Sequence, residues 1–123
     1  MNQKIKLYKS VVTGIGASLP KKIVTNKDLT KIVDTTEEWI VERTGIEERR
    51  IASDNETTSS LGTEAAKIAL QDAQLKNTDI DLIILATATP DNTFPASATV
   101  IQSSLGIETV SYTHLRAHET DRY

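Results

Sequence analysis

Cysteine is absent from all 123 residues of this chain. The absence excludes disulfide bonds, thiolate metal sites and a cysteine nucleophile within these residues. The sequence also lacks any run of about 18 apolar residues, the length that a membrane helix needs. Its N-terminus has basic residues but no apolar stretch after them, so it does not resemble a secretory signal. We therefore predict a cytoplasmic protein.

An excess of charge of either sign is absent as well. The net charge is −3, and charged residues make up 25% of the chain beside 38% hydrophobic residues. This balance is typical of a soluble globular protein, and the length allows one domain at most. Because no strong positive field is expected, neither a nucleic acid nor a membrane is predicted as a partner.

Local signals along the chain predict an alternation of strands and helices. Short β-branched or wholly apolar runs indicate strands, whereas capping residues followed by helical spacing indicate helices. We expect strands at residues 10–17 and 81–88, and helices at 26–33, 36–44, 57–73 and 95–105. The predicted caps are Thr25, Thr35 with Glu38, Gly45 and Gly106.

The run at 81–88 is apolar without alternation, which is typical of a strand covered on both faces in a parallel or mixed sheet. The order strand, helices, strand, helix gives an α/β layout with crossover connections. Too few elements are present to cover both faces of that strand. The sequence therefore predicts part of a domain rather than a whole one.

One pair of side chains suggests a nucleotide. Trp39 and Arg43 lie four residues apart on a predicted helix, hence on one face, and Thr35 lies at its start. An indole offers a stacking surface, a guanidinium binds phosphate, and a helix N-terminus offers free N–H groups. The alternative is a core tryptophan beside a solvated arginine. Spacing alone favours this alternative.

Longer motifs carry a resemblance. The chain contains, in order, the runs GIGASLP, DTTEEWIVERTGIEERRIA, DLIILATATPD and FPASATVIQSSLGI. From about residue 11 to 107 it resembles the β-ketoacyl-acyl-carrier-protein synthase III family, most specifically in EWIV and RTGI. The resemblance implies an α/β, thiolase-like fold of αβαβα layers, with residues 1–107 forming part of its N-terminal half.

The resemblance also implies function. Family members are homodimeric acyltransferases that condense an acyl-CoA, often acetyl-CoA, with malonyl-acyl-carrier protein to start fatty-acid synthesis. No cofactor is bound permanently, and coenzyme A enters as the thioester substrate. The family pattern places Trp39 against the CoA adenine, Thr35 within hydrogen-bond reach of that base and Arg43 near the phosphates. Phe94 corresponds to a residue that lines the partner's acyl pocket across the dimer.

The likeness ends after Ile107. Residues 108–123 are predicted to be an unrelated, artefactual tail with no strand and no catalytic cysteine, although the family cysteine would fall at about Glu119. The family's histidine and asparagine would lie further on, so no catalytic residue is expected and the chain is predicted to be inactive. His114, His118 and Glu119 have helical spacing for zinc, but two histidines without a convincing third ligand favour no metal site.

Two other functions stay open. The chain could be a non-catalytic module that binds coenzyme A or a nucleotide. Alternatively, it derives from a related thiolase-fold synthase with another acyl starter.

Overall fold

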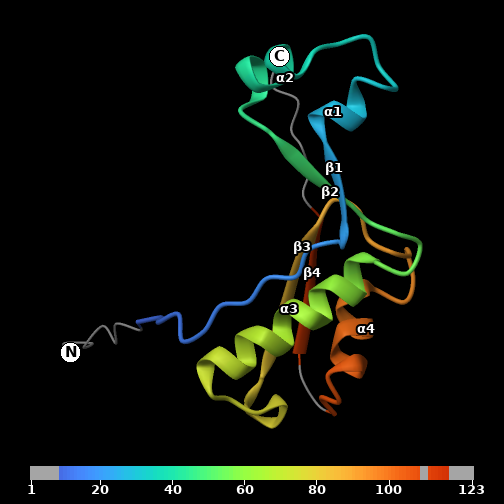
Figure 1. Cartoon of the computed structure of the whole chain (residues 1–123). Coiled ribbons are helices and arrows are strands. Elements are labelled where there is room, and N and C mark those ends of the chain that lie inside the picture. Colours follow the sequence, from blue (N-terminus) through green and yellow to red (C-terminus); the bar gives the residue numbers. More distant parts are fainter. Residues whose placement is uncertain (1–8, 109–110, 117–123) are drawn as a thin grey trace, which may run out of the picture.

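The computed structural model of the chain describes residues 9–108 and 111–116. Its elements are β1 (Lys22–Thr25), α1 (Asn26–Leu29), α2 (Glu37–Thr44), β2 (Glu48–Ile51), α3 (Thr58–Ala73), a 3-10 turn (Asn77–Asp79), β3 (Leu82–Thr87), α4 (Ser97–Ser104) and β4 (Ser111–Arg116). Figure 1 shows two parts, one above the other. Residues 22–51 form a hairpin unit, and α3, β3, α4 and β4 form a sheet unit.

The sheet unit contains two parallel strands. β3 pairs with β4 in a register that sets Leu82 opposite Ser111 and Thr87 opposite Arg116, and α4 makes the crossover between them. The expectation of no strand after residue 108 is therefore wrong. Ladder hydrogen bonds use backbone groups, so the free edge of β3 accepts an extended segment whatever its side chains. The origin of residues 108–123 stays a prediction.

Only one face of β3 is covered by helices. Ile83 and Leu85 are half-buried, whereas Leu82 and Ile84 are 50% and 61% exposed. The parallel pairing confirms the predicted sheet type, but the prediction of cover on both faces is wrong for the described part of the chain. No second helical layer is present there to bury the alternate side chains.

The residues predicted as the first strand form no strand. Residues 9–19 instead run extended along α3 (Figure 1). A Cβ on Gly16 would clash with the carbonyl oxygen of Ala65, and one on Gly14 with that of Ala69. The Ile15 N–H donates to Asp72 Oδ2 at 3.0 Å. The two glycines therefore allow a backbone contact with a helix where we expected pairing with a strand.

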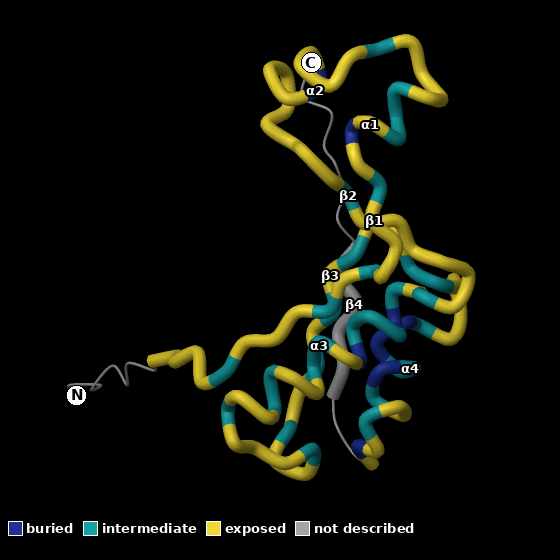
Figure 2. Tube along the Cα trace, in the orientation of Figure 1, coloured by how far each residue is buried: buried dark blue, intermediate teal, exposed yellow. Residues whose placement is uncertain are grey.

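Helix α3 begins as predicted. Thr57 is its N-cap and accepts a hydrogen bond from the Ser60 N–H. Gly62 faces Ile101 of α4, so the two helices approach closely. Of the sheet-unit residues whose burial is described, the buried apolar ones are Ala98, Ile101 and Ile107. Figure 2 shows the buried positions of this unit gathered mainly on α4. Among the described residues, no helix is both long and apolar enough to cross a bilayer.

Other helix boundaries differ from prediction by a few residues. Helix α4 begins at Ser97 rather than at Pro95, and Gly106 follows it in the predicted left-handed conformation. Helix α1 ends at Leu29 rather than at residue 33. The cap of α2 is Thr36 rather than Thr35, although Gly45 ends that helix at φ 67° as predicted.

The hairpin unit has an antiparallel pair at its base that the sequence did not predict. β1 pairs with β2, and Lys22 lies opposite Ile51. Thr25 ends β1 and caps α1 as predicted, in a capping box with Asp28. Hydrogen bonds from Thr25, together with the nearby Lys31, lower the pKa of Asp28 to about 2.

Asp91 joins the loop after β3 to the start of α3. Its Oδ1 accepts from the Thr58 N–H at 2.6 Å and its Oδ2 from the Ser59 N–H at 2.9 Å. These are two of the N–H groups that have no partner within a helix. The Asp91 N–H in turn donates to Ser97 Oγ of α4 at 3.1 Å. Asp91 thus connects three parts of the sheet unit, α3 through its carboxylate and α4 through its backbone N–H.

Replacement of this carboxylate is expected to destabilise the chain in a pH-dependent way. Asp91→Asn loses one acceptor and the negative charge at the helix N-terminus, which costs about 1–2 kcal/mol. Partial burial raises the pKa of Asp91, but hydrogen bonds from Ser59 and Thr58 outweigh it, so the pKa lies below its ordinary 3.8. The contribution of the Asp91 carboxylate to the free energy of unfolding is therefore full above pH 3.8. It is lost as the pH falls through the lower pKa of the folded state.

Urea unfolding of the wild type and the variant between pH 3 and 7 measures this difference. Asn92→Asp, at an exposed position, is the control for a change of one charge in the same loop. A difference between wild type and Asp91→Asn that stays constant across this range would contradict the assignment.

The contact between residues 9–19 and α3 predicts a second effect. Gly16→Ala is expected to push the segment off α3, because the clash is with helix backbone that cannot move aside. Steric changes of this kind cost about 1–3 kcal/mol. Ala17→Ser, at the exposed neighbouring position, should change little. Thermal unfolding followed by circular dichroism compares the two, and equal midpoints would show that the segment does not pack there.

Candidate functional site

A cavity of about 480 Å³ opens beside α2 in the hairpin unit. It lies between the end of α1, the connecting loop and the first turns of α2. Its walls are Leu29, Val33, Asp34, Thr35, Thr36, Trp39 and Ile40. Apolar side chains form most of the wall, and polar ones come from a single stretch of loop. Its volume falls in the range of small-molecule sites, about 300–1,000 Å³.

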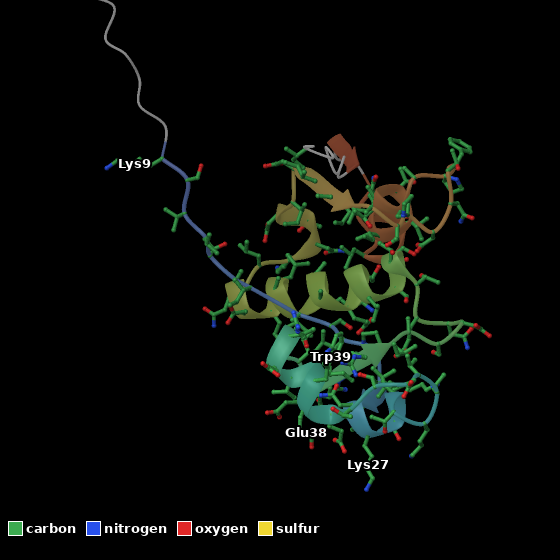
Figure 3. All side chains as sticks on the ribbon, turned by 90° about the horizontal axis from the view of Figure 1, so that it is seen from above. Lys9, Lys27, Glu38 and Trp39 are labelled. Atoms are coloured by element: carbon green, nitrogen blue, oxygen red, sulfur yellow. The ribbon has the colours of Figure 1, made fainter. Side chains whose placement is uncertain are left out.

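Trp39 is the largest side chain on this cavity. The backbone N–H of Trp39 donates to the Thr36 hydroxyl at 3.2 Å, which fixes the first turn of α2. The next residue, Ile40, is 7% exposed and anchors the helix. Trp39 itself is 55% exposed, and Figure 3 shows Glu38 extending outward from the same helix while Trp39 lies nearer the centre of the view. An exposed indole on a helix whose first turn is fixed offers a stacking surface to a ligand.

Arg43 lies one turn further along α2. Its guanidinium carbon is 5.8 Å from the centroid of the Trp39 ring, a cation–π contact of about 0.5–1 kcal/mol at an exposed site. Glu37 and Glu38 occupy the first turn of the same helix, and Arg43 its last. The N-terminal end of α2 is therefore acidic and disfavours phosphate. Of the two phosphate partners that the sequence suggested, the helix N–H groups and Arg43, the structure favours Arg43.

The structure brings three of the four predicted site residues together. Thr35 and Trp39 line one cavity, and Arg43 lies against the Trp39 ring. The alternative in which Trp39 is a core tryptophan is wrong, because the side chain is 55% exposed. Phe94 lies in another loop, between β3 and α4, where it is 90% exposed and takes no part in the cavity. The ligand roles of all four residues stay predictions.

Sequence reasoning missed the opposite wall. Leu29 and Val33 close the cavity across from α2, and nothing in their spacing relative to Trp39 indicates this. The loop between α1 and α2 brings these residues to one cavity. A mostly apolar cavity with polar side chains on one stretch of its wall and a neighbouring cation can hold an aromatic base that carries phosphate.

The metal prediction is not tested. His118 and Glu119 lie outside the described residues, and His114 belongs to β4. The part of the chain that the structure describes holds no cluster of three potential metal ligands.

Comparisons with known proteins identify relatives of this arrangement. No protein-family model matches the chain. Beta-ketoacyl-[acyl-carrier-protein] synthase III of Brucella anthropi is 58% identical over 101 residues, which are 82% of this chain and 31% of the relative. The crystal structure of 3-oxoacyl-[acyl-carrier-protein] synthase III from Aquifex aeolicus VF5 matches with a TM-score of 0.82 at 50% identity, covering 85% of this chain and 34% of that one.

A third relative is the priming beta-ketosynthase of the R1128 polyketide pathway. Its structure matches with a TM-score of 0.83 at 37% identity and covers 86% of this chain and 32% of that one. The two units described above are therefore part of the thiolase-like fold of condensing synthases. Within that class, the chain belongs to the β-ketoacyl-[acyl-carrier-protein] synthase III family. It spans about a third of the length of the relatives it matches.

Proposed function

We propose that this chain supplies the coenzyme A cleft of a β-ketoacyl-acyl-carrier-protein synthase III. The whole protein would condense an acyl-CoA, with acetyl-CoA as the first choice, with malonyl-acyl-carrier protein to start fatty-acid synthesis. One observation carries this proposal: Thr35 and Trp39 line a single cavity, and the Arg43 guanidinium lies against the indole.

Each group has a role that its chemistry suits. The adenine would stack on Trp39 and be held from the other side by the aliphatic wall of Leu29 and Val33. The Thr35 hydroxyl would bind an edge nitrogen of the base. Arg43 would bind phosphate, because a guanidinium offers paired donors and a permanent charge. The thioester is a substrate that comes and goes, so no permanently bound cofactor is proposed.

Condensation needs groups that lie beyond these residues. In the family a cysteine thiolate takes the acyl group, and a histidine and an asparagine support decarboxylation of the malonyl thioester. With no cysteine among its 123 residues, this chain would bind coenzyme A without transferring an acyl group. The proposal includes a cytoplasmic location and a homodimer in which Phe94, exposed in the loop before α4, reaches the partner's acyl pocket.

Loss of the indole is expected to weaken coenzyme A binding by the chain. Trp39→Ala removes the stacking surface, worth about 1–3 kcal/mol for a base on an aromatic ring, so Kd should rise about 5- to 150-fold. Trp39→Phe keeps a smaller ring and should lose less. Isothermal titration calorimetry with coenzyme A measures the three affinities, and equal binding by wild type and Trp39→Ala would end the proposal for this cleft.

The chain by itself is expected to form no acetoacetyl product from acetyl-CoA and malonyl-acyl-carrier protein. The physical reason is that the acyl group has no thiolate to accept it. Mass spectrometry of the carrier protein detects the product, with a complete relative as the positive control. Turnover by these 123 residues alone would contradict the assigned division of roles.

Two alternatives are supported by specific observations. A stand-alone module that binds coenzyme A is consistent with a cavity made wholly by residues 29–40. A synthase with another starter is consistent with the match to a priming ketosynthase. Reading the gene beyond the codon for Ile107 separates synthase from module: a cysteine in an Ala-rich turn supports either synthase, and its absence supports the module.

A further inference from the structure

A buried asparagine joins the two helices on either side of the cavity. Asn26, the first residue of α1, is only 3% exposed. Its Nδ2 donates to the Ile46 carbonyl oxygen at 2.8 Å, and its backbone N–H donates to that of Glu47 at 3.2 Å. Both acceptors lie immediately after Gly45, which ends α2. The start of α1 is thus fixed to the end of α2.

Arg49 of β2 completes this cluster. Its Nη2 donates to Asn26 Oδ1 at 2.9 Å. Its Nη1 is buried and has no hydrogen-bond partner among the described residues. Because Arg49 is half-buried and its Nη1 has no partner there, its bond to Asn26 contributes more than a fully exposed one would. We call Asn26 and Arg49 the amide clamp.

The hairpin unit has little else to fix its geometry. Within residues 22–51, all of which the structure describes, Ile40 is the one buried apolar side chain. Helix α1 is four residues long, and β1 and β2 are four residues each. An apolar core of this size cannot set the distance between two short helices. Figure 2 shows most of the unit exposed, with intermediate burial around α1.

That distance decides the width of the cavity. Leu29 comes from the end of α1, and Trp39 from α2. Both line the cavity, from different elements. A slot for a planar base has to match the thickness of the ring, and small displacements of one wall lose stacking contacts. The clamp lies where α1 begins and α2 ends, and neither Asn26 nor Arg49 lines the cavity.

We propose that Asn26 and Arg49 are positioning residues that hold α1 and α2 at the separation at which the cavity accepts the adenine of coenzyme A. This inference rests on the proposed function. The clamp would raise the affinity of the cleft for coenzyme A by positioning α1 and α2. Asn26 and Arg49 would not touch the ligand themselves.

The test uses the single tryptophan of the chain. All tryptophan emission comes from Trp39, so acrylamide quenching measures its exposure directly. The variants are Asn26→Ala and Arg49→Met, of which the second removes the clamp without leaving a buried cation. The matched controls are Asn55→Ala and Arg50→Met, both at exposed positions. Each arginine variant removes one positive charge, so nonspecific attraction of coenzyme A changes equally in the pair.

Both clamp variants are expected to raise the Kd for coenzyme A at least tenfold and to change the quenching constant of Trp39. The controls should stay within twofold of the wild type. Measurements are made at a temperature where circular dichroism shows each variant folded, because a merely structural role would lower the thermal midpoint and leave folded-state quenching unchanged. Wild-type quenching and affinity in both clamp variants would overturn the inference.

Failure of the proposed function gives a different result. If the wild-type chain binds no coenzyme A, the ligand assignment is wrong, and with it the stated purpose of the clamp. The quenching comparison then still decides whether the clamp sets the position of Trp39. Equal quenching in the clamp variants and the wild type would reject that role as well.

Discussion

The hairpin unit depends on hydrogen bonds because it has almost no apolar core. Its helices are short, and Ile40 alone buries an apolar side chain among residues 22–51. Thr25, Thr36 and Asn26 supply the contacts that a larger core would otherwise provide. Hydrogen bonds are directional, so they fix orientation as well as distance. A ligand cavity can therefore be built on two helices that would not form alone in water.

The sheet unit, in contrast, is held together mainly by apolar packing. Its helices α3 and α4 pack closely, and buried side chains such as Ala98 and Ile101 hold them. The Asp91 carboxylate then connects the loop after β3 to the start of α3. The candidate site lies on the part of the chain with less burial, as is common for segments that bind ligands.

Sequence reasoning succeeded where the signal is local. The cap Thr25 and the helix-ending glycines Gly45 and Gly106 depend on neighbouring residues, so their positions could be predicted. It failed for β1 and β2, because Glu48–Ile51 is a charged segment without alternation whose partner lies over twenty residues away. The pair Trp39 and Arg43 was visible from helical spacing. The facing wall and the Asn26–Arg49 bond were not, since contacts between distant residues leave no periodic pattern.

The exposed backbone edge of β3 has a consequence for the life of the chain in a cell. Strand pairing recognises main-chain geometry, and β4 joins β3 through a register that any extended segment of suitable reach could adopt. Among the described residues β4 is the one partner of β3, so the second edge of β3, beside Leu82 and Ile84, can pair with a further strand of the same protein or of another polypeptide. The outcome then depends on rates: pairing of the β3 edge within one molecule has to be faster than its pairing with a strand of another molecule.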